Sequence, residues 1–383
     1  MLRQDGRYDD ALREGEEGAS GSTSRDAAYA VPMFSLVMPV HDSELYLPQA
    51  MDAVRAQTCP DWELIVVDDA SSDASAEIME GYAREDARIK PVHLEENRGA
   101  SAARNVGLDL ARGRYVGFLD SDDTYDSDML ERIWGSVDCN PADIVLFGLV
   151  EEYFGRDGKF QYANEVLPRE CICRTPEEVH LQALDLEESL LLGYAWNKVY
   201  LREQLDGLRY EEGVPLIEDA FFNIEFFDRA RSANLLAFAP YHYAKRQGAN
   251  LTNRFVPEYF VLHRRRIEMV YDQQCRWGLD SEEVRSTLGA LYGRYILSAL
   301  ERNCDPRSGM DHAARVAWCR GLFDDELFVK LMPVAHAKDS RALDMCLCVL
   351  RRRSPTLCCM LGRFIHVFRR MADESFSKLK SGR

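Results

Sequence analysis

The chain has 383 residues, 46% of them hydrophobic and 29% charged, which is enough for one large globular domain or two ordinary ones with a sizeable core. Its formal net charge of −17 argues against broad nucleic-acid binding, because contacts with phosphates need a basic surface. No apolar run in the sequence reaches the ~18 residues that a membrane-spanning helix needs.

The eleven cysteines are scattered and form no Cys-x-x-Cys or Cys/His cluster with the spacing of a zinc site. The sequence does not begin like a signal peptide, so we expect a cytoplasmic protein with reduced thiols. Residues 1–30 are rich in Asp, Glu, Gly, Ser and Arg and poor in large apolar side chains, which predicts a disordered lead-in.

From Phe34 onward, short apolar runs alternate with stretches of helical periodicity. The predicted strands are Phe34–Pro39, Trp62–Val67, Ile89–Leu94 and Tyr115–Leu119, and the predicted helices between them are Leu45–Gln57, Ala74–Ala83 and Ala100–Ala111. Strands that alternate with helices of ~10 to 13 residues indicate βαβ units and a parallel sheet. Because the apolar runs do not alternate with polar residues, we expect helices to cover the sheet on both faces.

Four polar clusters follow a predicted strand or open a predicted helix. They are Pro39–Glu44, Asp68-Asp69, Asn97–Gly99 and Asp120–Asp123. In a parallel α/β sheet these positions share one edge, at the carboxyl ends of the strands, where ligands bind. We therefore expect the four clusters to converge on one rim.

The cluster Asp120–Asp123 contains three carboxylates beside one another. Neighbouring carboxylates repel, and each raises the pKa of the other, unless a bound divalent cation removes the penalty. Taken alone, a solvated acidic turn between a strand and a helix explains this string equally well.

The regular alternation fades beyond Val150. Residues 151–255 mix polar loops with aromatic-rich pieces, and the spacing from Pro257 onward is mostly helical. We predict a boundary near residue 255, with residues 256–383 forming a helical region that ends in a basic amphipathic tail.

Seven motifs, in order between Phe34 and Phe255, resemble those of family 2 glycosyltransferases, of the type that builds bacterial capsule, lipopolysaccharide and exopolysaccharide chains. They are Ser35–Val40, Val67–Ser71, Asn97–Gly99 with Ala103–Asn105, Phe118–Asp123, Trp196–Lys198, Glu218-Asp219 and the segment 241–252. The resemblance implies an α/β GT-A fold, a Rossmann-like and mostly parallel sheet flanked by helices. Residues 31–150 would be its nucleotide-sugar-binding half and residues 151–255 its acceptor half.

The resemblance also implies a nucleotide-sugar donor, expected to be a UDP-sugar, and a divalent cation, Mn²⁺ or Mg²⁺. Asp122 is the first candidate for metal ligation, with Asp120 beside it, and Asp69 would hydrogen-bond the imide N–H of uracil. The other expected donor-side residues are Pro39, Val40 and Glu44 at the nucleoside, Arg98 or Arg104 at the diphosphate, and Ser121. The alternative for Arg104 is a surface helix residue in a salt bridge.

On the acceptor side, the resemblance implies an inverting single displacement in which a carboxylate removes the proton of the attacking hydroxyl. Asp219 is the predicted general base, with Glu218 orienting it or the acceptor. The alternative for this pair is simple charge stabilisation at the start of a predicted helix, Ala220–Ala230. The remaining expected acceptor-side residues are Trp196, which could instead be a core aromatic, Asn197 and Lys198.

The segment 241–252 resembles the loop that closes over bound donor in the family. His242, Arg246 and Thr252 lie in it, and His242 stands where the family often has tyrosine. We therefore do not assign His242 to a metal.

The C-terminal tail differs in charge from the rest of the chain. Residues 341–383 hold ten Lys/Arg and three Asp/Glu, about +7. Apolar residues recur there at three- and four-residue steps, namely Leu357, Met360, Leu361, Phe364, Ile365 and Phe368. Such a helix either lies on an anionic membrane surface or packs its stripe onto the protein's own core, and the sequence leaves both open. The membrane reading would place the protein on the inner face of the cell membrane.

Two other function classes compete with a glycosyltransferase of cell-surface polysaccharide synthesis. A non-catalytic nucleotide-sugar-binding scaffold would share the fold, but every expected acid is present. Asp120-x-Asp122-x-Thr124 also resembles the nucleophile loop of haloacid-dehalogenase-type phosphatases. That loop follows the first strand in those enzymes, whereas here it follows the fourth predicted strand.

Overall fold

The structure is a computed structural model that describes residues 31–155, 157–246, 255–338 and 340–371. The predicted lead-in at residues 1–30, Thr252 of the predicted closing loop and residues 372–383 of the tail lie outside the described residues.

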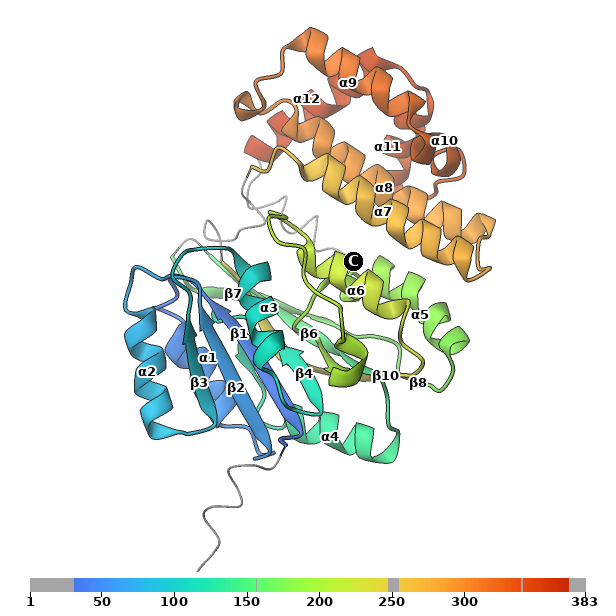
Figure 1. The fold of residues 1–383 in the computed structure, drawn as a ribbon. Helices are drawn as coiled ribbons and strands as arrows, with labels where there is room; N and C mark the ends of the chain where they lie inside the picture. The colour runs from blue at the N-terminus through green and yellow to red at the C-terminus, as the bar shows by residue number, and fades with distance from the viewer. Residues whose placement is uncertain (1–30, 156, 247–254, 339, 372–383) are drawn as a thin grey trace, which may run out of the picture. The chain divides into compact units, whose positions relative to one another are not determined.

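The first half of the sheet is parallel, as predicted. Its elements are β1 (Phe34–Val40), α1 (Leu47–Arg55), β2 (Trp62–Asp68), α2 (Ser75–Glu85), β3 (Ile89–His93), α3 (Ala100–Leu110) and β4 (Tyr115–Phe118). Strand β1 pairs in parallel with β2 and β4, and β2 pairs in parallel with β3, so these strands run side by side (Figure 1). Every residue of β2 is buried, which explains why its sequence is apolar without alternation.

The second half joins the first through an antiparallel strand. Its elements are β5 (Thr124–Tyr125), α4 (Met129–Cys139), β6 (Ile144–Phe154), β7 (Phe160–Val166), β8 (Cys171–Cys173), α5 (Pro176–Glu188), β9 (Lys198–Leu201), α6 (Glu218–Phe227) and β10 (Ala233–Arg246). The main path of the sheet is β3-β2-β1-β4-β9-β6-β10-β5. Strand β9 is antiparallel to both β4 and β6, whereas β10 is parallel to β6. The sheet is therefore mostly parallel, with β9 as the junction between its two halves.

Helix α3 lies close against β1 because a glycine faces the strand. A Cβ atom at Gly107 would lie 2.2 Å from Cγ1 of Val37, far inside van der Waals contact. One turn earlier on the same helix, Arg104 turns its side chain into the interior. The close approach of α3 to the sheet thus places the guanidinium of Arg104 beneath the carboxyl edge of the strands.

The described chain between Tyr259 and Met371 is mostly helical, as the spacing predicted. The helices are α7 (Tyr259–Arg276), α8 (Glu282–Arg302), α9 (His312–Asp324), α10 (Glu326–Leu331), α11 (Arg341–Arg351) and α12 (Pro355–Met371), and α7 and α8 pack side by side (Figure 1). Helix α7 contacts α5 through a buried ion pair in which Arg266 donates to both carboxylate oxygens of Glu187, at 2.9 and 2.7 Å. Among the described residues, no helix is both long and apolar enough to cross a membrane. The domain boundary near residue 255 stays a prediction.

Candidate active site

The four polar clusters meet at the carboxyl edge of the parallel strands, as expected. Oδ1 of Asp69 accepts the backbone N–H of Arg98 at 2.8 Å, and its Oδ2 accepts the N–H of Gly99 at 2.7 Å. The hydroxyls of Ser43 and Ser121 lie 2.9 Å apart. These contacts tie the loops after β1, β2, β3 and β4 into one surface.

The predicted nucleoside residues are held firmly within this surface. Asp69 is buried, and because each carboxylate oxygen keeps a lone pair beyond its backbone contact, a hydrogen bond to a base stays compatible with the structure. The carboxylate of Glu44 accepts the N–H of Ala74 at 3.0 Å, so it fixes the loop after β1 to the start of α2. Val40 is buried, Pro39 is half-buried, and the carbonyl of Val40 accepts the N–H of Asp69 at 2.8 Å.

Arg104 lies at the centre of the acidic residues. Its Nη2 is 3.2 Å from Oδ1 of Asp120, and its Nη1 is 3.0 Å from both Oε1 of Glu218 and Oδ1 of Asp219. The side chain is only 5% exposed, so the reading of Arg104 as a surface helix residue is wrong. Its terminal nitrogens face carboxylates of the protein, whereas Arg98 is exposed at the rim.

The environment of Asp120 and Asp219 raises the pKa values of these two carboxyl groups. Burial raises the pKa of Asp120 to about 6, with the charge of Arg104 opposing the shift and that of Asp122 adding to it. Burial likewise raises the pKa of Asp219 to about 7, again opposed by Arg104 and increased by Glu218. A carboxyl group that titrates near neutral pH is well matched to proton transfer.

Asp123 has a structural role that the sequence did not reveal. Its Oδ1 accepts the N–H of Ala244 at 2.9 Å, and its Oδ2 accepts the hydroxyl proton of Tyr241 at 2.9 Å. The same hydroxyl accepts the N–H of Asp120 at 3.2 Å. Asp123 and Tyr241 thus anchor the acidic loop to β10, and the buried ring of Tyr241 stacks on Trp196 at 4.0 Å.

Asp122 is more exposed than Asp120 and Asp123, and it lines a cavity together with Asp123. Its side chain is 49% exposed and pairs with Arg246, whose Nη1 lies 3.3 Å from Oδ2. The cavity is about 380 Å³ in volume, and its lining includes Tyr46, Gln49, Asp122, Thr124, Glu152, His242 and Arg246. The ring nitrogens of His242 lie 3.0 Å from Glu152 and 3.2 Å from Asp126.

The carboxylate oxygens at this site are the kind of ligand that a hard divalent cation prefers. Asp120 and Asp122 offer carboxylate oxygens, and the charge of Asp122 raises the pKa of Asp120, a repulsion that a cation would relieve. In the described part of the chain, no group of three or more His, Cys, Asp or Glu side chains is arranged to hold a metal. A cation held by Asp120 and Asp122 could complete its coordination with oxygens of water or of a bound diphosphate.

Helix α6 begins with an unusual backbone conformation. Ile217, immediately before Glu218, has a φ of 59°, a left-handed value that a β-branched residue rarely adopts. Such strain is often found where a turn must aim a functional group. Glu218 and Asp219 occupy the first turn of α6, where the helix dipole also favours negative charge.

The three expected acceptor-side residues of the Trp196–Lys198 motif lie in the interior. Trp196 is buried and stacks on Tyr194 at 4.4 Å. The ammonium group of Lys198 donates to the carbonyls of Leu191 and Tyr194 at 2.7 and 2.5 Å, and to Oδ1 of Asn197 at 2.6 Å. Asn197 and Lys198 are fully buried, so their side chains fix the segment before β9 and present no atom to solvent.

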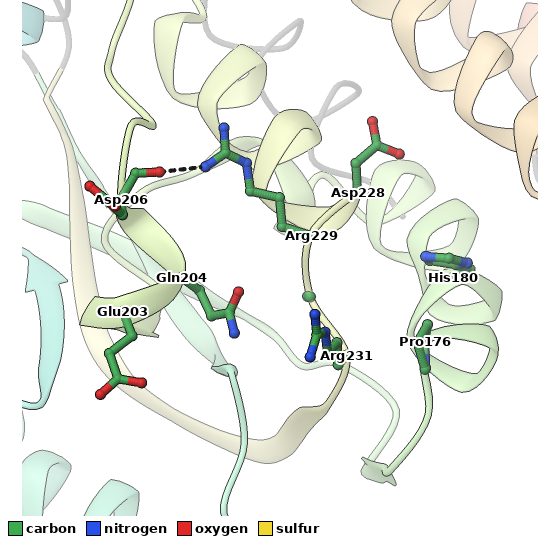
Figure 2. A pocket seen from close by; sticks show the side chains of 9 residues that line it. Pro176, His180, Glu203, Gln204, Asp206, Asp228, Arg229 and Arg231 are labelled. Atoms are coloured by element: carbon green, nitrogen blue, oxygen red, sulfur yellow. Dashed lines mark hydrogen bonds between the residues drawn. The ribbon is translucent and has the colours of Figure 1, made fainter.

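A second hollow, about 450 Å³ in volume, contains none of the predicted site residues. It lies at the opposite end of α6 and is lined by Pro176, His180, Glu203, Gln204, Asp206, Asp228, Arg229, Ala230 and Arg231 (Figure 2). Arg229 donates to the backbone carbonyl of Asp206 at 2.8 Å across its edge (Figure 2). Acidic and basic side chains both line this hollow, and none of Asp120, Asp122, Glu218 and Asp219 is among them.

Sequence comparisons match the same part of the chain. The family model described as Glycosyl transferase family 2 matches residues 35–192. The chain is 33% identical over 215 residues to the uncharacterized glycosyltransferase EpsJ of Bacillus subtilis (strain 168), covering 56% of this chain and 61% of EpsJ. It is 29% identical over 234 residues to the poly(ribitol-phosphate) beta-N-acetylglucosaminyltransferase TarS of Staphylococcus aureus (strain Mu50 / ATCC 700699), covering 59% of this chain and 38% of TarS. The matches therefore span less than two thirds of these relatives.

Structural comparison extends the similarity in fold. The crystal structure of residues 1–349 of S. aureus TarS in complex with UDP-GlcNAc superposes with a TM-score of 0.63 at 20% identity, covering 88% of this chain and 92% of that one. Together with the mostly parallel sheet, this similarity shows that the chain has the GT-A fold, and residues 35–192 of it match the model of Glycosyl transferase family 2.

Proposed function

We propose that the chain is an inverting, metal-dependent glycosyltransferase that moves a sugar from a nucleotide-sugar donor, expected to be a UDP-sugar, to a hydroxyl of a glycan or lipid-linked acceptor in cell-surface polysaccharide synthesis. One observation carries the proposal. Asp120 of the rim and the acids Glu218 and Asp219 of α6 converge on a single buried guanidinium, that of Arg104. This arrangement supports the proposal, because it brings the acid that we assign to the donor side close to the acids that we assign to the acceptor side.

In the proposed reaction, Asp219 removes the proton of the attacking hydroxyl as that oxygen displaces the nucleoside diphosphate from the anomeric carbon. The hydroxyl oxygen attacks the anomeric carbon on the face opposite to the departing nucleoside diphosphate, so this single displacement inverts the configuration without a covalent intermediate. Because burial raises the pKa of Asp219 to about 7, its carboxylate can accept a proton near neutral pH. Glu218, bonded to Arg104 beside it, would orient the base or the acceptor.

Asp122 and Asp120 would hold the divalent cation. When bound, such a cation supplies neutralisation of the charge that develops on the leaving diphosphate. Ser121, between the two acids, fixes their loop to the loop after β1 through its contact with Ser43. Arg98, exposed at the rim in an ion pair with Glu212 at 2.8 Å, is the arginine that can turn toward a diphosphate without breaking a buried contact.

Calorimetric titration with UDP tests the nucleotide site. We expect binding that requires Mn²⁺ or Mg²⁺ and is lost in EDTA, followed by turnover of a UDP-sugar in an acceptor screen with lipid extracts and oligosaccharides. Binding of UDP without turnover of any donor would favour the scaffold. Failure of UDP, GDP and dTDP to bind would contradict the proposal.

The proposal includes peripheral contact with an anionic membrane through residues 341–383. Helix α12 divides the apolar stripe between two faces, because Leu361 and Ile365 pack against the core whereas Phe364 is 67% exposed. The other exposed apolar residues of this helix include Leu357, Met360, Val367 and Phe368. Exposed Arg353 and Arg363 flank this outer face, so its charge is complementary to anionic headgroups.

Vesicle sedimentation tests the membrane contact. We expect the protein to bind vesicles that contain phosphatidylglycerol and not vesicles of phosphatidylcholine alone, and we expect Phe364→Glu to abolish binding. Leu181→Glu, at a position on α5 that is 58% exposed, is the matched control and should bind normally. Equal sedimentation of wild type and Phe364→Glu would contradict the proposal, as would a dimer in solution that Phe364→Glu dissociates.

A further inference from the structure

Arg104 connects two segments that are far apart in the sequence. Its partners are Asp120, directly after β4, and Glu218 and Asp219, which lie 114 and 115 positions further along the chain at the start of α6. Arginine can make these contacts at once because its guanidinium presents several N–H groups in a fixed plane. A lysine has a single nitrogen and cannot point in both directions with the same geometry.

The three carboxylates are not held in the same way. Nη1 of Arg104 donates an aligned hydrogen bond to Oε1 of Glu218 at 3.0 Å. Oδ1 of Asp219 lies equally close to Nη1 but has no aligned hydrogen bond among the described residues. Asp219 is therefore held by charge, whereas Glu218 is held by a directed bond. Without a directed hydrogen bond at Oδ1, the carboxylate of Asp219 keeps lone pairs that can accept a proton.

Asn105, the neighbour of Arg104 on α3, fixes the backbone of Tyr210 beside the guanidinium. Asn105 accepts the N–H of Tyr210 at 2.8 Å and donates to its carbonyl at 2.9 Å. The ring of Tyr210 stacks on Phe222 at 4.1 Å and lies 5.4 Å from the guanidinium carbon of Arg104. The pair Arg104-Asn105 thus contacts both the acids and the segment that carries the aromatic ring of Tyr210.

We propose that Arg104 is a positioning residue. Its buried guanidinium holds Asp219 at a fixed distance from Asp120, so that the group that activates the acceptor is aligned with the group that binds the donor. The inference rests on the proposed function, and it replaces the expected contact between Arg104 and the diphosphate. Rates fall steeply when a catalytic group is misplaced by ~1 Å, so loss of this alignment should reduce turnover more than binding.

The test compares Arg104→Lys and Arg104→Gln with wild type in nucleotide binding, donor KM, kcat and the dependence of kcat on pH. We expect UDP affinity and donor KM to stay within about threefold of wild type, and kcat to fall about 10- to 100-fold. The acidic limb of the profile should move to higher pH in Arg104→Gln, because the lost charge no longer favours ionised Asp219. Arg104→Lys, which keeps the charge, should show a smaller displacement.

Arg266→Lys is the matched control, because Arg266 is equally buried and paired with Glu187, yet it contacts none of the rim acids. It should lower thermal stability without moving the pH profile. A donor KM that rises with unchanged kcat in the Arg104 variants would overturn the inference in favour of diphosphate contact, and an unchanged kcat and pH profile would overturn it outright. If wild type itself turns over no donor, the proposed function fails instead.

Discussion

Arg246 and Asp122 form an ion pair at the cavity, with Nη1 of the arginine 3.3 Å from Oδ2 of the carboxylate. Nη2 of Arg246 also donates to the backbone carbonyl of Asp122 at 2.9 Å. The guanidinium stacks over the ring of Tyr46 at 3.9 Å. Arg246 therefore compensates the charge of the carboxylate to which we assign the divalent cation.

A cation must compete with this arginine. Arg246→Gln should raise the affinity for Mn²⁺ in the absence of nucleotide by about 1.4- to 5-fold, because a partly exposed ion pair is worth about 0.2–1 kcal/mol. Calorimetric titration with MnCl₂ at low ionic strength measures this change. Arg276→Gln, which breaks an exposed pair with Asp228, is the control and should leave Mn²⁺ affinity unchanged. A weaker Mn²⁺ affinity in Arg246→Gln would contradict the competition.

Asp122→Asn should abolish cation-dependent binding of UDP, because a neutral amide does not replace the charge of a carboxylate ligand. Titration with UDP in the presence and absence of Mn²⁺ measures the loss. Asp128→Asn, on the exposed surface before α4, is the control. UDP binding that stays Mn²⁺-dependent in Asp122→Asn would remove Asp122 from the metal site.

Asp219→Asn should leave UDP binding intact and reduce kcat by about 10²- to 10⁴-fold, the range expected for loss of a general base. In wild type, the pKa of Asp219 is raised to about 7, so kcat should increase with pH through that value as the carboxylate ionises. Near-normal turnover of Asp219→Asn, or a profile flat between pH 6 and 8, would assign the base to another residue.

Gly107→Ala should destabilise the protein by about 1–3 kcal/mol, because its Cβ atom would meet Val37 at 2.2 Å and push α3 away from β1. Gly135→Ala in α4 is the matched control. A Cβ there meets nothing within 4 Å, so the variant should be neutral or up to ~1 kcal/mol more stable. Chemical unfolding measures both, and equal effects would show that helix propensity alone decides at Gly107.

Glu63 should make stability depend on pH. Burial alone would raise its pKa, but hydrogen bonds from Lys90, Ser35 and Arg112 outweigh burial and lower the pKa from 4.5 to about 2. Because the folded-state pKa lies below the unfolded one, this stabilisation is present above pH 4.5 and is lost as the pH falls toward 2.

Glu63→Gln should therefore cost about 2–3 kcal/mol at pH 7 and progressively less toward pH 3, measured by urea unfolding. Glu85→Gln, which removes an exposed pair with Arg55, is the control and should cost at most ~1 kcal/mol at either pH. A cost of Glu63→Gln that does not change with pH would contradict the linkage.

The parallel half of the sheet could be predicted from the sequence because its signals are local. The buried runs that became β1 and β2 are apolar without alternation, and helical stretches separate them. Once the strands are parallel, their carboxyl ends share an edge, so the convergence of Asp69 and Ser121 on one rim follows from topology. Pattern reading therefore located the rim and its acids.

The partners of Arg104 could not be predicted in this way. Helical periodicity places Arg104 on α3 but carries no information about residues more than 100 positions away. Its contact with Glu218 and Asp219 depends on β9, whose antiparallel insertion joins the two halves of the sheet. The burial of Lys198 at the start of the same strand is likewise a consequence of this pairing.

The sequence by itself determined the order of strands and helices along the first 120 residues, the acids of the rim and the resemblance to family 2 glycosyltransferases, because hydrophobic periodicity and motif order are local properties of the chain. Only the tertiary structure decided that Arg104 is buried among three carboxylates and that α12 packs Leu361 inward while exposing Phe364. These outcomes depend on which surfaces meet across long sequence separations, where packing and charge compensation, rather than periodicity, set the free energy.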